Sequence, residues 1–462
     1  MGNTRKFEVE TTPRRTTVAE IDRVVPSALS GDNQLMLDAT MRHRIGELTL
    51  TVVGADGVPL DDRVVTVAQR SHAFSFGNIA FDLVGLVAGP EQVNAETVAD
   101  FGGRSHAELD RLGGQWLGLF NTATLPFYWG SYEPRRGHPD VQRLTQTAQW
   151  LADRGVTVKG HPLVWHTVQP PWLLPLPLDE IERLQRERIR DLVGGFAGLI
   201  NVWDAINEAV IMPVFENGDN AITRLAWDRG RIFMVRIAFE AARAANPSAT
   251  LVLNDFDLST AYECLIEGVL EAGIEVDAIG LQTHMHQGYR GEEYMERMLD
   301  RFARFGLPLH MTESTIVSGD LMPAEIEDLN DYQITDWPTT PEGEARQADE
   351  IVRHYRSLVA HPSVHVINYW GLTDDGAWLG APVGLVRKDG SLKPSYLALE
   401  QLIKGEWWVP PTPMRTDPQG GIRVRGFFGD YSVSVGDGEA SFAVSPGSTA
   451  ATVRLTDPPP SK

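Results

Sequence analysis

Hydrophobic and polar positions follow two different patterns along the chain. Between residues 81 and 406, short apolar runs alternate with stretches in which apolar residues recur at helical spacing. The runs with strand character are FSFGNIAF, LFNTATL, VTVKGHPLVW, LINVWDAI, ATLVLND, VDAIGLQTH, PLHMTES and VHVINYWGL. Between them lie helical patterns such as VQRLTQTAQWLADRG and RIFMVRIAFEAARAANP, which end at Gly or Asn-Pro stop signals. Eight strands interleaved with helices predict an α/β fold, a (β/α)8 TIM barrel over 81–406.

The segments on either side of this region alternate apolar and polar residues with a period of two. Residues 41–80 contain IGELTLTVVGADGVPLDDRVVTVAQRSHAFSFG, in which GADGVP predicts a turn between two strands. The alternation returns in IRVRGFFGDYSVSVGDGEASFAVSPGSTAATVRLT, after the Pro- and Gly-rich VPPTPMRTDPQGG. We expect 41–80 and 407–462 to associate as one small accessory β-sandwich. Residues 1–40 are polar and irregular and are expected to form an N-terminal arm.

Composition narrows the classes of function. The chain has 462 residues, of which 42% are hydrophobic and 22% charged, as in a globular protein with a sizeable core. A net charge of −21 argues against nucleic acid and anionic membrane surfaces as partners. With one cysteine, Cys264, the chain can form neither an internal disulfide nor a multi-cysteine metal site. The sequence shows no signal-peptide core, so a cytoplasmic location is expected, or a secreted one if a leader has been removed.

Side chains suited to catalysis and binding stand where the expected barrel strands end. In barrels of this class the active site forms at the carboxyl ends of the strands. A single Trp or His at such a position is usually structural, but a concentration of them at one end of a barrel predicts a site. The residues at these ends are His161, Trp165, His166, Asn207, Glu208, Asn254, Asp255, Gln282, His284, Glu313 and Trp370, with Trp378 in the following loop.

Glu208 on the fourth strand and Glu313 on the seventh can face each other across a substrate. Two carboxylates about 5–5.5 Å apart suit retaining glycoside hydrolysis, in which one attacks the anomeric carbon and the other protonates the leaving oxygen. A Glu at the mouth of an apolar strand loses solvation, which raises its pKa toward the range useful for a general acid. A sugar also needs aromatic platforms and hydrogen-bonding groups, and the candidates are Trp165, Trp370, Trp378, His161, Asn207, Gln282 and His284.

Several of these segments, taken in order, resemble glycoside hydrolase family 10, whose usual members are β-1,4-xylanases. They are GHPLVWHTVQPPWL, VWDAINEA, LVLNDFDL, IGLQTHMH, LHMTES and INYWGLTDDGAWLG, spread over about residues 120–395, and the flanks VTVAQRSHAFSFG and RGFFGDYSVSV resemble plant-type members. The resemblance implies that Glu208 is the acid/base and Glu313 the nucleophile. It also implies that Asn207 binds the 2-hydroxyl of the sugar and that His284 hydrogen-bonds the nucleophile. Neither a cofactor nor a metal is implied.

The sequence departs from the family pattern on one side of the site. Where family members have Thr-x-Glu-Asn-x-Met-Lys-Trp, this chain has TATLPFYW, so Thr124, Leu125 and Tyr128 replace sugar-binding residues. Val168 likewise takes the place of a sugar-binding Gln. These changes fall on the −2 side, which Leu125, Phe127 and Tyr128 are expected to make apolar and aromatic, with Tyr128 contacting substrate. A site that has lost these hydrogen bonds should discriminate poorly for xylan.

The leading hypothesis is a retaining β-glycosidase that acts by double displacement on small glycosides or oligosaccharides rather than on polymeric xylan. An ordinary endo-β-1,4-xylanase is the alternative within the same class. From other classes, the altered −2 side leaves open a non-catalytic carbohydrate-binding protein. A metal-dependent hydrolase is suggested by His161, His166, His284 and His286, although HMH lacks matching ligands on the first strand. The sugar, the linkage, exo or endo cleavage and the oligomeric state stay open.

Overall fold

A computed structural model describes residues 40–88, 105–215 and 219–456. The chain divides into two compact units, 1–40 and 41–462. The expected N-terminal arm, except for Thr40, lies outside the described residues, as do the last residues, 457–462. None of the helices in the described ranges combines the length and apolar character that a membrane crossing requires.

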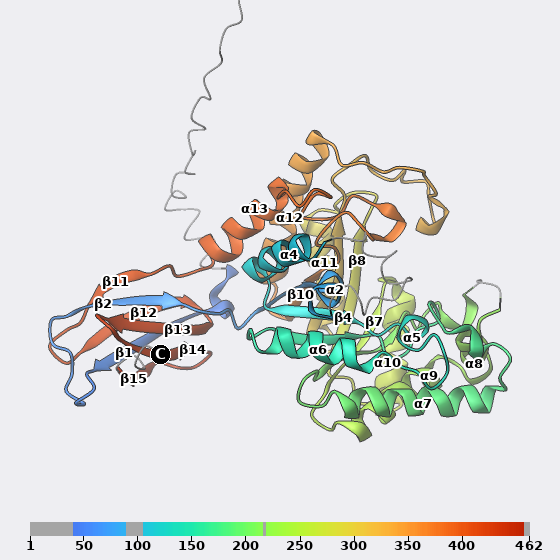
Figure 1. Ribbon diagram of the computed structural model, residues 1–462, viewed down its shortest axis with the longest axis horizontal. Helices are drawn as coiled ribbons and strands as arrows, with labels where there is room; N and C mark the ends of the chain where they lie inside the picture. Colours follow the sequence, from blue (N-terminus) through green and yellow to red (C-terminus); the bar gives the residue numbers. More distant parts are fainter. Residues whose placement is uncertain (1–39, 89–104, 216–218, 457–462) are drawn as a thin grey trace, which may run out of the picture. The chain divides into compact units, whose positions relative to one another are not determined.

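Eight parallel strands close into a barrel in the order β10-β3-β4-β5-β6-β7-β8-β9, which confirms the predicted fold class. Helices lie around these strands in Figure 1. Each apolar run quoted above contains all or most of one of the strands. The strands are β3 (Ser75–Ile79), β4 (Thr122–Pro126), β5 (Thr157–His161), β6 (Val202–Asn207), β7 (Thr250–Asp255), β8 (Ala278–Met285), β9 (Leu309–Ile316) and β10 (Val364–Tyr369). Their long buried runs are typical of parallel sheets that are covered on both faces.

Helices follow the strands because apolar residues recur at a spacing of three or four. In α11, for example, Met295, Met298, Leu299 and Phe302 are buried. Local signals fix several helix starts: Ser105 and Glu108 form a capping box at α4. The helices are α2 (Phe81–Ala88), α4 (His106–Leu119), α5 (Trp129–Tyr132), α6 (Val141–Ala152), α7 (Leu178–Gly195), α8 (Ala221–Arg229), α9 (Arg231–Ala245), α10 (Thr260–Glu271), α11 (Glu292–Ala303), α12 (Pro341–Ala360) and α13 (Pro394–Glu400), then a π-helix (Gln401–Glu406) and short 3-10 turns such as η4 (Met212–Val214).

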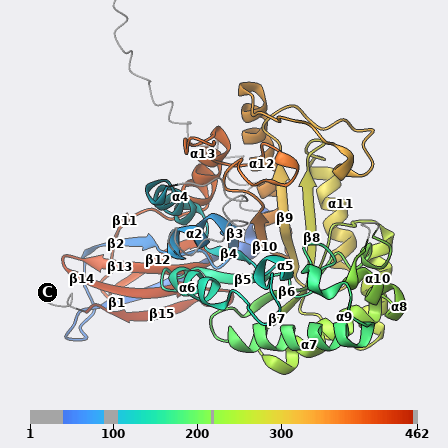
Figure 2. The ribbon, with the colours of Figure 1, turned by 45° about the vertical axis from the view of Figure 1, so that its right-hand side comes forward.

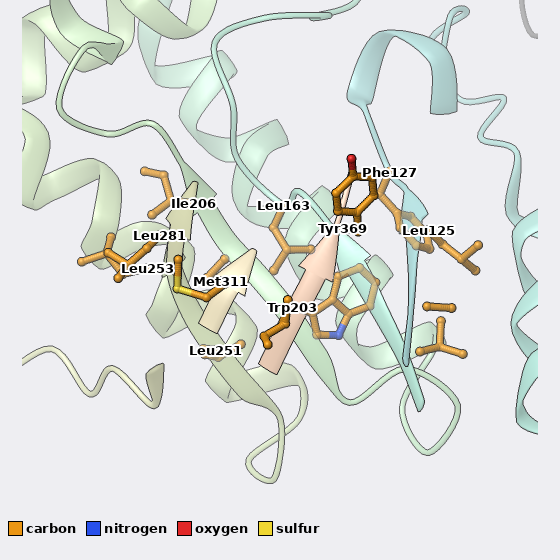
Figure 3. Packing of buried hydrophobic residues seen from close by; sticks show 14 of the residues in the cluster. Leu125, Phe127, Leu163, Trp203, Ile206, Leu251, Leu253, Leu281, Met311 and Tyr369 are labelled. Carbon is orange, nitrogen blue, oxygen red and sulfur yellow. The ribbon is translucent and has the colours of Figure 1, made fainter. Parts of the chain in front are cut away.

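A continuous hydrophobic core joins the strands to the helices around them. Trp203 on β6 is fully buried in it, among the aromatic and aliphatic side chains shown in Figure 3. The neighbouring strand makes room for this indole through Gly160, where a Cβ atom would lie 2.1 Å from the Trp203 ring. The close approach of β5 to β6 therefore requires a glycine at this position.

The segments at the two ends of the described chain form one accessory β-sandwich, as expected (Figure 2). One sheet has the order β12-β1-β15 and the other β11-β2-β13-β14. The period-two pattern gives the sandwich a core of its own: Leu48, Leu50 and Val52 of β1 are buried, and the residues between them are more exposed. The strands are β1 (Ile45–Val53), β2 (Val64–Gln69), β11 (Thr412–Arg415), β12 (Gly421–Phe427), β13 (Gly429–Val435), β14 (Gly438–Val444) and β15 (Ala450–Arg454).

The barrel begins earlier than the expected boundary between residues 80 and 81. Strand β3 pairs with β10 and β4, so a boundary at 80 assigns the first barrel strand to the sandwich. The segment SHAFSFG continues the alternation of apolar and polar residues seen in the preceding strands. A short strand with this pattern can belong either to the sandwich or to the barrel. Which sheet it joins depends on long-range pairing with Val366–Tyr369, nearly three hundred residues away.

Candidate active site

The ends of strands β6 to β9 bring the predicted polar residues into one hydrogen-bonded group. Asn207 Nδ2 donates to Glu208 Oε1 at 3.0 Å, and Asn254 Nδ2 donates to Asn207 Oδ1 at 2.7 Å. The same Asn254 amide donates to Glu313 Oε1 at 3.1 Å, and Gln282 Nε2 donates to Asn207 Oδ1 at 2.9 Å. The two carboxylates are thus connected through the amide groups of Asn207 and Asn254.

Glu208 combines a strained backbone with an unusual electrostatic environment. Its φ of 58° lies in the left-handed region, which is uncommon for a residue other than glycine and occurs at functional sites. Burial raises the pKa of the Glu208 carboxyl to about 8, and the negative charge of Glu313 acts in the same direction. The Trp165 Nε1–H group donates to Glu208 Oε2 at 2.7 Å and opposes this rise. At neutral pH Glu208 therefore carries the proton that a general acid needs.

Glu313 is buried, and each of its two carboxylate oxygens lies close to a side-chain nitrogen atom. Asn254 contacts Oε1, and His284 Nε2 lies 3.1 Å from Oε2. The other nitrogen of His284 lies 3.2 Å from the Thr315 hydroxyl, so the imidazole is held between two groups of the same strand. The contact between His284 and the carboxylate is the one that the family resemblance implies.

Aromatic rings surround the other half of the barrel mouth, at the ends of β10, β3, β4 and β5. Ring centroids of Tyr128 and His161 lie 5.6 Å apart, those of Tyr128 and Trp165 5.5 Å, and those of His161 and Trp370 5.0 Å. Phe81, at the start of α2, contacts both Tyr128 and Trp370. These five rings are called the aromatic wall below. Because Trp165 also donates to Glu208, the wall meets the polar group at the candidate acid.

Trp378 is separate from the aromatic wall. It is 39% exposed, and its ring lies 5.4 Å from His284 and 5.1 Å from His286. The Trp378 indole therefore lies beside His284, the imidazole that contacts Glu313. The predicted substrate-binding tryptophans are therefore distributed over both halves of the mouth.

The expectation that Leu125 and Phe127 line the −2 side is wrong. Both side chains are fully buried (Figure 3), and Phe127 packs against Phe196 and Trp203 in the core. Only Tyr128 of that group reaches the site, because consecutive residues at a strand end face different ways.

Thr124 and Val168, the other two positions expected to differ from the family pattern, differ in their exposure to solvent. Thr124 is fully buried, and its hydroxyl donates to Asn368 Oδ1 at 3.2 Å inside the barrel. Val168 is 46% exposed and has a φ of 47°, a strained conformation for a β-branched residue. The Val168 carbonyl accepts a hydrogen bond from Gly130 N at 2.6 Å, which ties this loop to the start of α5.

The geometry just described agrees with an independent comparison with known proteins. The family model described as glycosyl hydrolase family 10 matches residues 122–401. The chain belongs to this family. It is accordingly a retaining glycoside hydrolase that acts on O-glycosyl bonds and is similar to endo-1,4-β-xylanases.

Relatives of this family-10 chain are about a quarter identical to it over the residues that align. A β-1,4-xylanase of Dictyoglomus thermophilum is 27% identical over 265 residues, which are 54% of this chain and 70% of that protein. Endo-1,4-β-xylanase B of Thermotoga neapolitana is 26% identical over 294 residues, 60% of this chain and 78% of that protein. The structure of xylanase 10B from Thermotoga petrophila in complex with xylobiose has the same fold, with a TM-score of 0.55 and 22% identity over 72% of this chain and 95% of that one.

The histidines that suggested a metal site have other partners in the family-10 barrel. His161 contacts Asp204, His284 contacts Glu313, and His166 packs against Phe215 at 4.2 Å between ring centroids. Within residues 40–88, 105–215 and 219–456, no group of three or more His, Cys, Asp or Glu side chains is arranged to hold a metal ion.

Sequence reasoning missed Phe81, Lys159 and Asp204. Phe81 belongs to the aromatic wall, and the two charged residues are buried under His161. A signal for the last two was present, since VTVKGH and VWDAI each place one charged residue inside an apolar strand. Lys and Asp are almost never fully buried unless they are paired.

Proposed function

We propose that the chain hydrolyses β-xylosides by double displacement, with Glu313 as the nucleophile and Glu208 as the acid/base. Glu313 attacks the anomeric carbon, the bond from that carbon to the leaving oxygen breaks, and the proton of Glu208 goes to the leaving oxygen. Water then attacks the anomeric carbon of the glycosyl ester, Glu208 takes a proton from this water, and the Glu313 carboxylate is released. The product keeps the β configuration.

The observation that carries this proposal is the different surroundings of the two connected carboxylates. Burial and the charge of Glu313 keep Glu208 protonated at neutral pH, with a pKa of about 8. Glu313 has nitrogen atoms of Asn254 and His284 near its two oxygens, which fix its orientation toward the mouth. Two carboxyl groups whose environments differ in this way support separate roles of acid and nucleophile.

The same proposal includes a preference for small glycosides or oligosaccharides over polymeric xylan. It is supported by the aromatic wall, by exposed Val168 and by the burial of Thr124, which together leave few hydrogen-bonding groups beside the reacting sugar. Buried or removed polar groups cannot hold the hydroxyls of a second sugar, so binding there is weaker. The ordinary endo-β-1,4-xylanase is the second candidate, favoured by the names of the relatives.

The test uses p-nitrophenyl β-xyloside, xylobiose to xylohexaose and polymeric xylan, with Glu208→Ala and Glu313→Ala as controls. We expect Glu313→Ala to lower kcat by about 10⁴-fold or more, because the nucleophile acts as a unit with the acid. Added azide should yield an α-glycosyl azide with Glu313→Ala and a β-glycosyl azide with Glu208→Ala. Unchanged turnover in Glu313→Ala rejects the mechanism.

The substrates separate the remaining candidates. Higher kcat/KM on the oligosaccharides than on xylan supports the preference, and the reverse order identifies an ordinary endo-xylanase. Xylo-oligosaccharide binding measured by calorimetry, without turnover of any substrate, would identify a carbohydrate-binding protein instead.

A further inference from the structure

Three buried side chains form a charged group directly beneath the reacting end of the site. Lys159 on β5 is 4% exposed, His161 at the end of β5 is 1% exposed, and Asp204 on β6 is fully buried. One oxygen of Asp204, Oδ2, lies 2.7 Å from Lys159 Nζ and 2.7 Å from His161 Nδ1. Burial alone would raise the pKa of Asp204, but the charge of Lys159 and the hydrogen bonds from His161 and Lys159 act against it and the pKa is about 2, so Asp204 is a carboxylate.

This arrangement fixes which nitrogen of His161 carries a proton. A carboxylate oxygen only accepts hydrogen bonds, so His161 Nδ1 must donate to Asp204. His161 Nε2 is then the atom at the mouth, 4.0 Å from Glu313 Oε1. A neutral ring offers a lone pair there, whereas a doubly protonated ring offers a positive N–H group. The charge behind the ring decides between the two forms.

Charged groups of both signs lie around His161. Asp204 and Glu313 place carboxyl groups next to the two ring nitrogens, and the Lys159 ammonium is paired with Asp204. The other neighbours are the rings of the aromatic wall, Tyr128, Trp165 and Trp370, from β4, β5 and β10. His310 on β9 is buried near Lys159 and Asp204, and burial lowers its pKa to about 3, so it stays uncharged.

The second imidazole next to Glu313 has no such charged group behind it. His284 Nδ1 faces the neutral hydroxyl of Thr315 at 3.2 Å. Of the two histidines, only His161 therefore has an ionised carboxylate at its rear nitrogen, and Lys159 is the cation that balances this carboxylate.

We propose that Lys159 is a positioning residue that keeps His161 neutral by pairing with Asp204, so that His161 Nε2 accepts a hydrogen bond from a hydroxyl of the reacting sugar. Lys159 lies behind His161 and acts on the sugar through it. The inference rests on the proposed function, since it assumes that the sugar binds between His161 and Glu313.

The experiment compares Lys159→Met with two matched variants. In Lys159→Met, unpaired Asp204 draws a proton onto His161, so kcat/KM at pH 5.5 should fall about 10–100-fold and recover as the pH rises toward 7.5. Lys159→Arg keeps the charge and should retain the wild-type pH profile. The double variant Lys159→Met/Asp204→Asn removes both charges and should return to within about 3-fold of the wild type, because a neutral amide oxygen still accepts from Nδ1.

The outcome that overturns the proposal is a pH profile of Lys159→Met parallel to that of the wild type, which would indicate a purely structural role. A double variant no better than Lys159→Met would do the same. Thermal unfolding of each variant, monitored by circular dichroism, shows whether a loss of activity is a loss of fold.

A second readout does not depend on turnover. In ¹⁵N-labelled protein the imidazole signals, assigned through a His161→Phe variant, should show a neutral ring protonated at Nδ1 between pH 5 and 8 in the wild type. In Lys159→Met the same ring should be doubly protonated at pH 5.5. A ring that stays neutral in Lys159→Met, with Asp204 taking the proton, overturns the inference. If Glu313→Ala remains active while the imidazole signals shift as expected, only the proposed function fails.

Discussion

The two halves of the barrel mouth are held together by different kinds of contact. Strands β6 to β9 contribute a network in which each amide serves more than one partner, as Asn254 does for Asn207 and Glu313. Strands β10, β3, β4 and β5 contribute the aromatic wall, whose rings meet in pairs at 5.0 to 6.4 Å. The polar half holds the residues to which the family resemblance assigns catalytic roles, whereas Tyr128 and Val168, which the sequence comparison expects to differ from the family, belong to the other half.

This difference has an energetic basis. Loss of one member of a buried network leaves its partners without hydrogen bonds. Each unpaired buried group destabilises the fold by about 1–3 kcal/mol, and a charged group by more. An aromatic pair contributes about 0.5–1.5 kcal/mol beyond the area it buries. An apolar ring such as Phe81 can be exchanged without stranding a charge, whereas His161 and Trp165 of the same wall each bond a carboxyl group. We infer that the polar half tolerates little change, whereas the aromatic wall is where substrate preference can vary.

Among variants that leave both carboxylates in place, the largest expected effect comes from the centre of the polar half. Asn254→Ala removes the amide that connects Asn207 to Glu313, so kcat/KM should fall by about 10²–10³-fold, as for the loss of an oriented donor at a reacting group. The matched control on the aromatic wall is Phe81→Leu, which strands no polar group and should cost less than about 5-fold. Equal losses in the two variants, measured on p-nitrophenyl β-xyloside, would show that the halves do not differ as described.

A smaller effect is expected where the halves meet. Trp165→Phe removes the N–H group that stabilises the ionised form of Glu208, so the pKa of Glu208 should rise further above about 8. Glu208 acts as an acid below its pKa, so the alkaline limb of the kcat/KM profile should move to higher pH, with about a 10-fold lower maximum. A limb that moves to lower pH, or stays in place, would contradict the role given to this hydrogen bond.

The smallest effect is expected from returning polar groups to the altered side. A Tyr128→Lys/Val168→Gln variant offers new donors beside the reacting sugar. The ratio of kcat/KM for xylotetraose to that for p-nitrophenyl β-xyloside should therefore rise about 3–10-fold, the value of one or two hydrogen bonds. Leu125→Met, at a buried position, is the control and should leave this ratio unchanged. An unchanged ratio in the double variant would mean that this side does not set the preference.

Much of the fold could be predicted because its signals are local. The apolar runs of the barrel and the period-two segments of the sandwich gave every barrel strand and both parts of the sandwich. The boundary near residue 80 is wrong although FSFGNIAF is counted among the barrel strands, because the same residues also continue the alternation of the sandwich segment. Pairing with β10 and β4 places β3 in the barrel. The prediction that the Phe127 side chain faces the site failed for a similar reason. The residues it packs against, Phe196 and Trp203, come from other elements of the chain.

The sequence by itself determined that carboxylates, amides and indoles stand at the ends of the strands of one barrel, because periodicity and strand ends are properties of a short stretch of chain. Only the tertiary structure decided how these groups act on one another. The pKa of Glu208 depends on burial and on Glu313, and His161 meets Asp204 and Lys159 only because β5 and β6 lie side by side. Desolvation and Coulomb energies are set by distances between strands, and those distances exist only once the barrel has closed.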